Sequence, residues 1–131
     1  MIRKLALLPA VAACIVTGTA FAETLAREAR SGQLSPLLSF SIYNVDTCYA
    51  GGLAQARVVT PPAHGKVEFR QGQSRVAGSC GTLVALSQQV FYTSRGGFRG
   101  ADEMVIEFEY NPTVEAPRTT SRRYTIRVQV R

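Results

Sequence analysis

The sequence has few of the residues on which enzyme active sites and metal centres depend. Its 131 residues include one histidine, His64, and three cysteines. Nothing in the sequence provides a histidine-assisted nucleophile or a metal cluster, and no carboxylate pair is evident. We therefore expect neither a hydrolytic enzyme nor a resident cofactor.

Uninterrupted stretches suited to long helices are also scarce. Eleven Gly, six Pro and eleven Phe plus Tyr residues are spread through the chain. This composition favours an all-β domain and excludes a helical bundle. With 46% hydrophobic and 18% charged residues, the length fits one globular domain. It does not fit a two-domain enzyme or a disordered tail.

The first 22 residues have the pattern of an export signal. Residues 1–4 form a short n-region made positive by Arg3 and Lys4, residues 5–16 form an apolar stretch, and residues 20–22 form a small-x-small cleavage site before Glu23. We expect cleavage there, which leaves a mature chain with no transmembrane segment. The predicted location is periplasmic or secreted, in a bacterium.

Two other interpretations of this segment stay open. One is a membrane anchor, although residues 5–22 are only just long enough to span a bilayer and contain Pro9. The other is a lipoprotein signal, because residues 11–14 resemble a lipobox that ends in Cys14. The apolar Ile15 and Val16 that follow are unlike the polar tether of a lipoprotein, so we favour cleavage before Glu23.

Cysteine counting agrees with export. Removal of Cys14 leaves Cys48 and Cys80, one pair in an oxidising compartment, which predicts a single structural disulfide. The alternative is a redox or metal pair. Against it, the two cysteines are far apart and His64 is the only histidine.

Residues 23–36 are expected to form a leader or linker with at most a short helix, and residues 37–131 the domain. Period-two alternation of Leu38, Phe40 and Ile42 predicts a half-buried strand. Further strands are predicted at 55–60, 66–70, 82–86, 89–93, 104–110 and 124–130, separated by turns that include 71–72 and 78–81. These intervals suit a two-sheet sandwich of about seven strands.

The last two predicted strands also have matching outer faces. If they pair in antiparallel fashion, Glu107 and Glu109 share a face with Arg123, Arg127 and Arg131. Exposed cross-strand ion pairs of this kind favour one register without holding the fold together. Part of the basic excess therefore has a structural explanation.

Three segments, 62–67, 90–93 and 98–104, resemble the bacterial immunoglobulin-like or cadherin-like repeats of surface adhesins. The resemblance covers about residues 60–131, and Phe98-x-Gly100-x-Asp102 is its most specific element. Ser94 replaces a usual Pro, Met104 replaces an aromatic residue, and one copy is present instead of an array. The resemblance implies an immunoglobulin-like antiparallel β-sandwich with a non-enzymatic structural or binding role in the cell envelope.

The resemblance also implies architectural roles for six residues. Pro62 and Gly65 would form a turn into a strand and Tyr92 would lie near the end of another. Phe98 would plug one end of the sandwich, Gly100 would allow a tight backbone path, and Asp102 would accept bonds from loop amides. His64, in the same turn, is expected at the surface.

In related repeats an Asp at the position of Asp102 helps to bind calcium. Calcium needs six to eight oxygen ligands, and the nearby acids here are Glu103 and Asp46. We therefore expect structural capping, with calcium as the open alternative.

The candidate binding surface consists of basic residues. The formal charge is +6, or +4 once Arg3 and Lys4 are removed with the signal. The clustered members are Arg95, Arg99, Arg118, Arg122 and Arg123. A solvated surface is the simplest interpretation, and a protein or an anionic envelope component is the expected partner, not nucleic acid. The alternative function is a small periplasmic inhibitor or chaperone-like factor that acts through the loop at 94–102.

Overall fold

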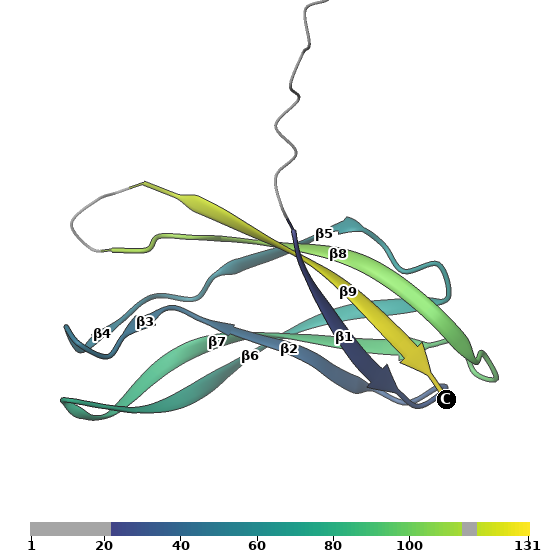
Figure 1. The fold of residues 1–131 in the computed structure, drawn as a ribbon, viewed down its shortest axis with the longest axis horizontal. Coiled ribbons are helices and arrows are strands. Elements are labelled where there is room, and N and C mark those ends of the chain that lie inside the picture. Colours follow the sequence, from purple (N-terminus) through teal and green to yellow (C-terminus); the bar gives the residue numbers. More distant parts are fainter. Residues whose placement is uncertain (1–21, 114–117) are drawn as a thin grey trace, which may run out of the picture.

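The computed structural model describes residues 22–113 and 118–131 (Figure 1). Apart from Ala22, the predicted export signal lies outside these residues, and so does Cys14. Within the described part of the chain, no helix is long and apolar enough to cross a membrane.

The described residues form an all-β structure, as the composition predicts. Its strands are β1 (Glu23–Ala29), β2 (Ser35–Ser41), β3 (Tyr43–Asn44), β4 (Tyr49–Ala50), β5 (Gln55–Thr60), β6 (Gly65–Gly78), β7 (Gly81–Ser94), β8 (Gly100–Tyr110) and β9 (Thr120–Val130). They make a four-stranded sheet of order β1-β9-β8-β5, a three-stranded sheet of order β2-β7-β6, and the short β3-β4 pair. Figure 1 shows the two larger sheets as separate layers.

Strand β1 corrects two expectations. Residues 23–36 are not a leader with at most a short helix, because Glu23–Ala29 is a strand and β2 begins at Ser35. Strand β1 also pairs in parallel with β9, from Glu23 beside Tyr124 to Ala29 beside Val130. The other pairings are antiparallel, so the expectation of an entirely antiparallel structure is wrong at this strand.

The β6–β7 hairpin is longer than the sequence predicts. The expected turn at residues 71–72 and the break between 86 and 89 are absent, and each strand runs for 14 residues. The register is continuous from Gly65 beside Ser94 to Gly78 beside Gly81. Gly72 pairs with Ser87 within this register, and a β-carbon there would lie 2.6 Å from Nε2 of Gln89, so this glycine permits close packing and makes no turn.

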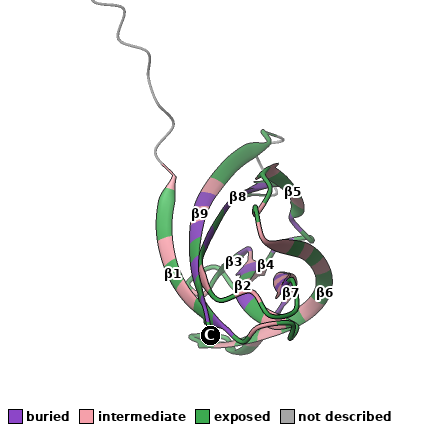
Figure 2. Ribbon diagram, turned by 90° about the vertical axis from the view of Figure 1, so that its right-hand side faces the viewer, coloured by how far each residue is buried: buried purple, intermediate pink, exposed green. Residues whose placement is uncertain are grey.

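The core lies between the two larger sheets. Met104, Ile106 and Phe108 of β8 are fully buried, as their alternation predicts. Tyr124, Ile126, Val128 and Val130 of β9 are buried in the same way. Phe108 stacks on Phe40 of β2, with ring centroids 4.4 Å apart and planes 8° from parallel. Figure 2 shows the buried stripes along β8 and β9.

Strand β2 departs from simple alternation at one point. Leu37 is buried and Leu38 is half-buried, although the period of two puts Leu38 on the inner face with Phe40. The register against β7 shifts between Pro36 and Leu38, as at a β-bulge. The inserted residue exchanges the faces of its neighbours, and this is why Leu37 and Phe40 both face inward.

The predicted disulfide joins Cys48 and Cys80, whose Cα atoms are 5.9 Å apart. Cys48 lies in the turn between β3 and β4, and Cys80 lies at the tip of the β6–β7 hairpin. The hydroxyl of Ser79 also donates to the carbonyl of Val45 at 2.9 Å. The bridge therefore fastens one hairpin tip to the other.

Candidate functional site

The residues of the adhesin-like motif meet at one end of the structure, around the carboxylate of Asp102. This residue is the third of β8 and is only 5% exposed. Its Oδ1 accepts the N–H of Ala63 at 3.0 Å, and its Oδ2 accepts the N–H of His64 at 3.1 Å. The backbone N–H of Glu103 also donates to Oδ1, at 2.9 Å. Asp102 thus makes the contacts with loop amides that a capping carboxylate requires.

Tyr92 of β7 supplies a further donor to this carboxylate. Its hydroxyl lies 2.7 Å from Oδ2 of Asp102, and its side chain is fully buried. Burial, together with this hydrogen bond and the negative charge of Asp102, raises the pKa of Tyr92 well above its usual range. Because β7 and β8 belong to different sheets, the bond links the two layers.

Gly65 lies directly against this tyrosine. A β-carbon at Gly65 would come within 2.5 Å of both the Tyr92 ring and the carbonyl oxygen of Thr93. The turn that begins at Pro62 therefore needs glycine at this position because of the close approach. The structure brings Gly65, Tyr92 and Asp102 together, and Pro62 directly precedes Ala63, whose amide donates to Asp102.

His64 and Phe98 form the outer part of the same cluster. Their rings are stacked with centroids 4.1 Å apart, and Nη2 of Arg95 lies 2.8 Å from Nδ1 of His64. His64 is thus a half-buried, partnered residue and not a free surface side chain. Phe98 packs against the core but is also only half-buried, so it covers the end of the sandwich instead of filling it. Gly100 beside it has a positive φ of 131°.

The donors around Asp102 bear directly on the calcium alternative. Both of its oxygens accept hydrogen bonds. Glu103 is paired with Arg127 at 2.9 Å, and Asp46 lies in the β3–β4 turn. Across residues 22–113 and 118–131, no three His, Cys, Asp or Glu side chains form a group that could hold a metal ion. The side chains and amides around Asp102 can therefore hold the neighbouring loops in place.

The candidate basic surface is divided between two ends of the four-stranded sheet. Arg95 and Arg99 lie in the β7–β8 loop, near the level where Gly100 pairs with Val130. Arg118, Arg122 and Arg123 lie near the opposite end, where Tyr110 pairs with Thr120. Strand β8 separates these levels by about 33 Å at the usual rise per residue. The five arginines therefore do not form one surface.

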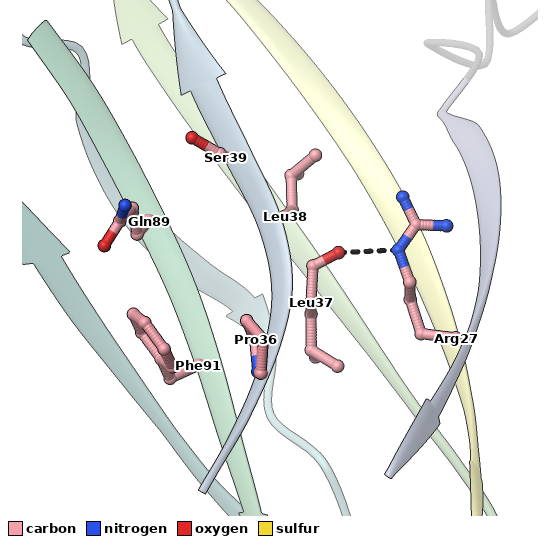
Figure 3. A pocket seen from close by; sticks show the side chains of 7 residues that line it. All are labelled: Arg27, Pro36, Leu37, Leu38, Ser39, Gln89 and Phe91. Atoms are coloured by element: carbon pink, nitrogen blue, oxygen red, sulfur yellow. Dashed lines mark hydrogen bonds between the residues drawn. The ribbon is translucent and has the colours of Figure 1, made fainter. Parts of the chain in front are cut away.

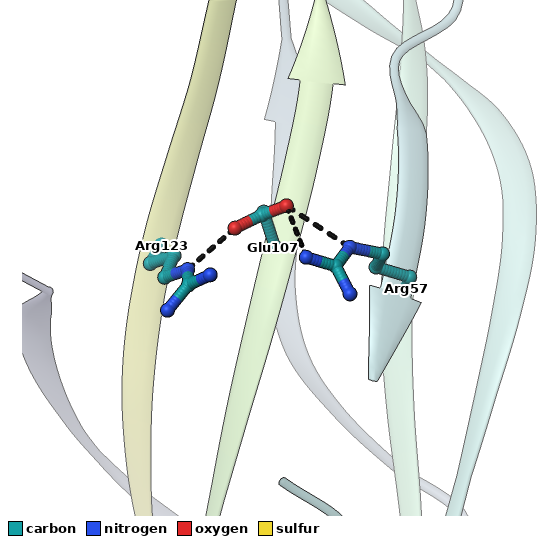
Figure 4. Close-up of polar contacts among 3 residues, drawn as sticks. All are labelled: Arg57, Glu107 and Arg123. Atoms are coloured by element: carbon teal, nitrogen blue, oxygen red, sulfur yellow. Dashed lines mark hydrogen bonds and ion pairs between the residues drawn. The ribbon is translucent and has the colours of Figure 1, made fainter. Parts of the chain in front are cut away.

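Arg123 belongs to an ion-pair network on the outer face of this sheet (Figure 4). Its Nε donates to Oε2 of Glu107, directly across the β8–β9 pairing. Arg57 of β5 donates to Oε1 from Nε at 2.9 Å and from Nη2 at 2.7 Å. Hydrogen bonds from Arg123 and then Arg57 hold the pKa of Glu107 below its usual range. Arg127 pairs with Glu103, and Arg131 with Glu28 of β1.

A second candidate site is the open side of the sandwich along β2, which we call the β2 groove. One hollow of about 390 Å³ lies beside Arg27, Leu37, Leu38 and Phe91. Figure 3 shows β2 passing between Arg27 on one side and Gln89 with Phe91 on the other. A second hollow of about 310 Å³ adjoins Arg122 and Tyr124. Leu38 and Ser39 line both hollows.

Sequence reasoning misses Arg27, which shapes this groove. Its Nε donates to the carbonyl of Leu37 at 2.6 Å, across the gap between β1 and β2. The signal that reveals this strand is the alternation of Leu25, Arg27 and Ala29, all at least partly buried, with exposed neighbours. A charged residue in the middle of the inward face hides that alternation.

Comparisons with known proteins leave the family open. No protein-family profile matches the sequence, and no curated protein is similar to it. Among solved structures, the chain has a distant likeness to one described as the solution structure of amebosin. The match has 15% identity and a TM-score of 0.40, and covers 86% of this chain and 100% of that one. No functional assignment follows from a likeness of this size.

Proposed function

We propose that the chain is an exported, non-enzymatic immunoglobulin-like domain with a binding role in the bacterial cell envelope. The observation that carries the proposal is the order of the strands. Immunoglobulin sandwiches place their second, fifth and fourth strands in one sheet, and their third, sixth and seventh in the other. With β2 counted as the second strand and β5 to β9 as the third to seventh, both sheets follow that order.

Two features differ from the constant-type antibody domain. Strand β1 lies beside β9, not in the sheet of β2. The disulfide joins two hairpin tips, whereas antibody domains bridge the two sheets between their second and sixth strands. Both features agree with a relative of the immunoglobulin sandwich in which the pairing of β1 with β9 and the disulfide between the hairpin tips hold the outer parts of the sheets.

Export is supported by two features of the chain, the N-terminal segment and the cysteine pair. The segment at residues 1–22 has the order of a cleavable signal, and Cys48 and Cys80 form a disulfide. A binding role at the β2 groove is supported by a contrast with the polar clusters. Asp102 and Glu107 are committed to hydrogen bonds and ion pairs that stabilise the structure, whereas the β2 groove is open.

The test is expression of the full chain in a bacterial host, followed by fractionation and intact-mass measurement. The proposal predicts a periplasmic or secreted protein that starts at Glu23 and has no free thiol. A cytoplasmic chain with reduced cysteines would contradict export. A mass that includes a lipid on Cys14 would show that the product is a lipoprotein and would contradict cleavage before Glu23.

Binding requires a separate test. A photo-crosslinking residue at exposed Ser39 should link the exported protein to an envelope protein, whereas the same residue at exposed Arg99 should not. Equal labelling at both positions would contradict a binding role for the β2 groove. The alternative, an inhibitor or chaperone-like factor acting through the loop at 94–102, predicts the opposite preference.

A further inference from the structure

The outer edge of β2 offers backbone groups to an additional strand. In the sheet order β2-β7-β6, strand β2 has a neighbour on one side only within the described residues. Alternate N–H and C=O groups of an antiparallel edge strand point away from that neighbour. An edge of this kind is a template for another extended chain.

The start of β2 is protected from pairing with an added strand, and the end of this protected part marks where the free edge begins. Pro36, the bulge between Pro36 and Leu38, and the bond from Arg27 to the Leu37 carbonyl all obstruct pairing at the start of β2. The following residues, from Leu38 to Ser41, have no such protection. An added strand therefore has its natural register beyond Leu37.

The β2 groove gives this edge an apolar lining with a positive charge at each end. One hollow combines Leu37, Leu38 and Phe91 with Arg27. The other combines Phe40, Tyr43 and Tyr124 with Arg122. No acidic residue lines either hollow. Charge complementarity thus favours a partner with carboxylates at two ends of an apolar segment.

The spacing between the two arginines can be obtained from the sheet register. Arg27 lies beside Val128, and Arg122 stands six positions before Val128 in β9. At the rise of a strand, this separation is about 20 Å. The guanidinium of Arg27 has five N–H donors, so donors are left for a carboxylate beyond its bonds to Leu37 and Ala26.

We propose that the β2 groove binds an extended segment of a partner protein by strand addition to β2, and that the segment carries acidic residues about six positions apart. This inference rests on the proposed binding function and names the chemistry of its partner. Backbone hydrogen bonds to the edge supply affinity, and the apolar lining with Arg27 and Arg122 supplies selectivity.

A second copy of the chain is a poorer occupant of this groove. Strand β2, with sequence SPLLSFS, has no acidic residue. Pairing of two β2 strands would bring Arg27 and Arg122 of both copies to the same interface, and like charges there oppose association. The charges at this edge therefore favour a different polypeptide as the occupant.

The test uses the oxidised protein, exported from cells that express the full chain, and a fluorescent peptide of about nine residues. The peptide has Glu near each end, about six positions apart, with Val and Thr alternating between them. We expect saturable binding, measured by anisotropy, that weakens as salt is raised. Replacement of Arg122 by Gln, and separately of Arg27 by Gln, should weaken binding about two- to fivefold each, as expected for exposed charge pairs. Arg99→Gln, the same change outside the groove, should leave affinity unchanged.

N-methylation of the peptide tests the backbone hydrogen bonds directly. Methyl groups on alternate amides of one register should abolish binding, and methyl groups on the intervening amides should leave it intact, because only every second amide faces β2. Equal effects of both registers would overturn strand addition even if the arginine variants lose affinity.

Three other results would also overturn the inference. They are no peptide binding by the folded, oxidised protein, binding to anionic vesicles in place of the peptide, and a dimer whose formation requires the β2 edge. The first leaves export and the immunoglobulin-like order of strands intact. Failure of export or oxidation would be detected earlier, by mass measurement, and would count against the proposed function instead.

Discussion

The hydroxyl of Tyr92 donates to Oδ2 of Asp102 at 2.7 Å, and this bond joins β7 of one sheet to β8 of the other. The same carboxylate holds the amides of Ala63 and His64. One buried acidic group therefore ties both layers to the turn at residues 61–64. This arrangement explains why Tyr92 and Asp102 are adjacent in space, and we expect both residues to matter to folding before they matter to binding.

Removal of the Tyr92 hydroxyl should destabilise the domain. Tyr92→Phe leaves the carboxylate of Asp102 with one donor fewer in a buried setting, and hydrogen bonds to charged groups contribute about 1.5 to 3 kcal/mol. Urea unfolding monitored by circular dichroism measures the loss. Tyr43→Phe, at a side chain that is 45% exposed, is the matched control and should change the free energy of unfolding by less than about 0.5 kcal/mol. Equal stability of the two variants would contradict the account of Asp102.

Asp102→Asn should also lose stability, and it should do so regardless of calcium. Asn places an NH₂ group where one carboxylate oxygen accepts donors, so at least one N–H loses its acceptor, at a cost of about 1 to 3 kcal/mol. Melting is measured for wild type and variant with calcium and with a chelator. A calcium-dependent rise in the melting temperature of wild type alone would show that Asp102 is a metal ligand.

Glu107 should make stability depend on pH in the acidic range. Because Arg123 and Arg57 lower its pKa in the folded state, the unfolded chain binds a proton more readily. The stabilisation is complete above the unfolded pKa of about 4.3 and is lost as pH falls through the folded pKa. Glu107→Gln should therefore reduce stability at pH 7 and flatten the dependence below pH 5.

The control for this variant is Glu109→Gln on the same strand, which faces Ser121 across the β8–β9 pairing. Stability curves from urea unfolding at several pH values should converge at low pH for wild type and Glu107→Gln. A constant difference at all pH values would show that lost packing, and not lost charge, causes the effect.

The disulfide should contribute a large share of stability. A closed loop of about 33 residues is worth about 3 to 4 kcal/mol in the chain-entropy model. Replacement of both Cys48 and Cys80 by Ser should lower the melting temperature by on the order of 15 °C, and a reductant should do the same to wild type. Ser79→Ala, which removes only the neighbouring bond to Val45, should have a much smaller effect. Melting that is insensitive to reductant would refute this prediction.

The most regular strands were the easiest to predict from sequence. Strands β8 and β9 alternate without interruption, and Glu107 faces Arg123 as the pattern indicates. Sequence patterns do not reveal strand β1, because Arg27 occupies an inward position, where a charge conceals the period of two. The sequence predicts a turn at Gly72, because the close packing of this glycine against Gln89 depends on a residue that is distant in sequence.

The candidate site was predictable only in part, for the same reason. The capping role of Asp102 follows from its place in a strand-opening motif. The contact of His64 with Arg95 joins residues 31 positions apart, and Arg57 reaches Glu107 across 50. Such pairs depend on which strands become neighbours, and local patterns in one sequence do not give that order.

The most direct measurement of the central claim is amide hydrogen exchange along β2, recorded by NMR with and without the acidic peptide. Strand addition predicts that edge-facing amides between Leu38 and Ser41, which exchange rapidly in the free protein, become protected when the peptide is bound. The intervening amides, already bonded to β7, should change little. Unchanged exchange across β2, with protection appearing in the β7–β8 loop instead, would contradict strand addition at this edge.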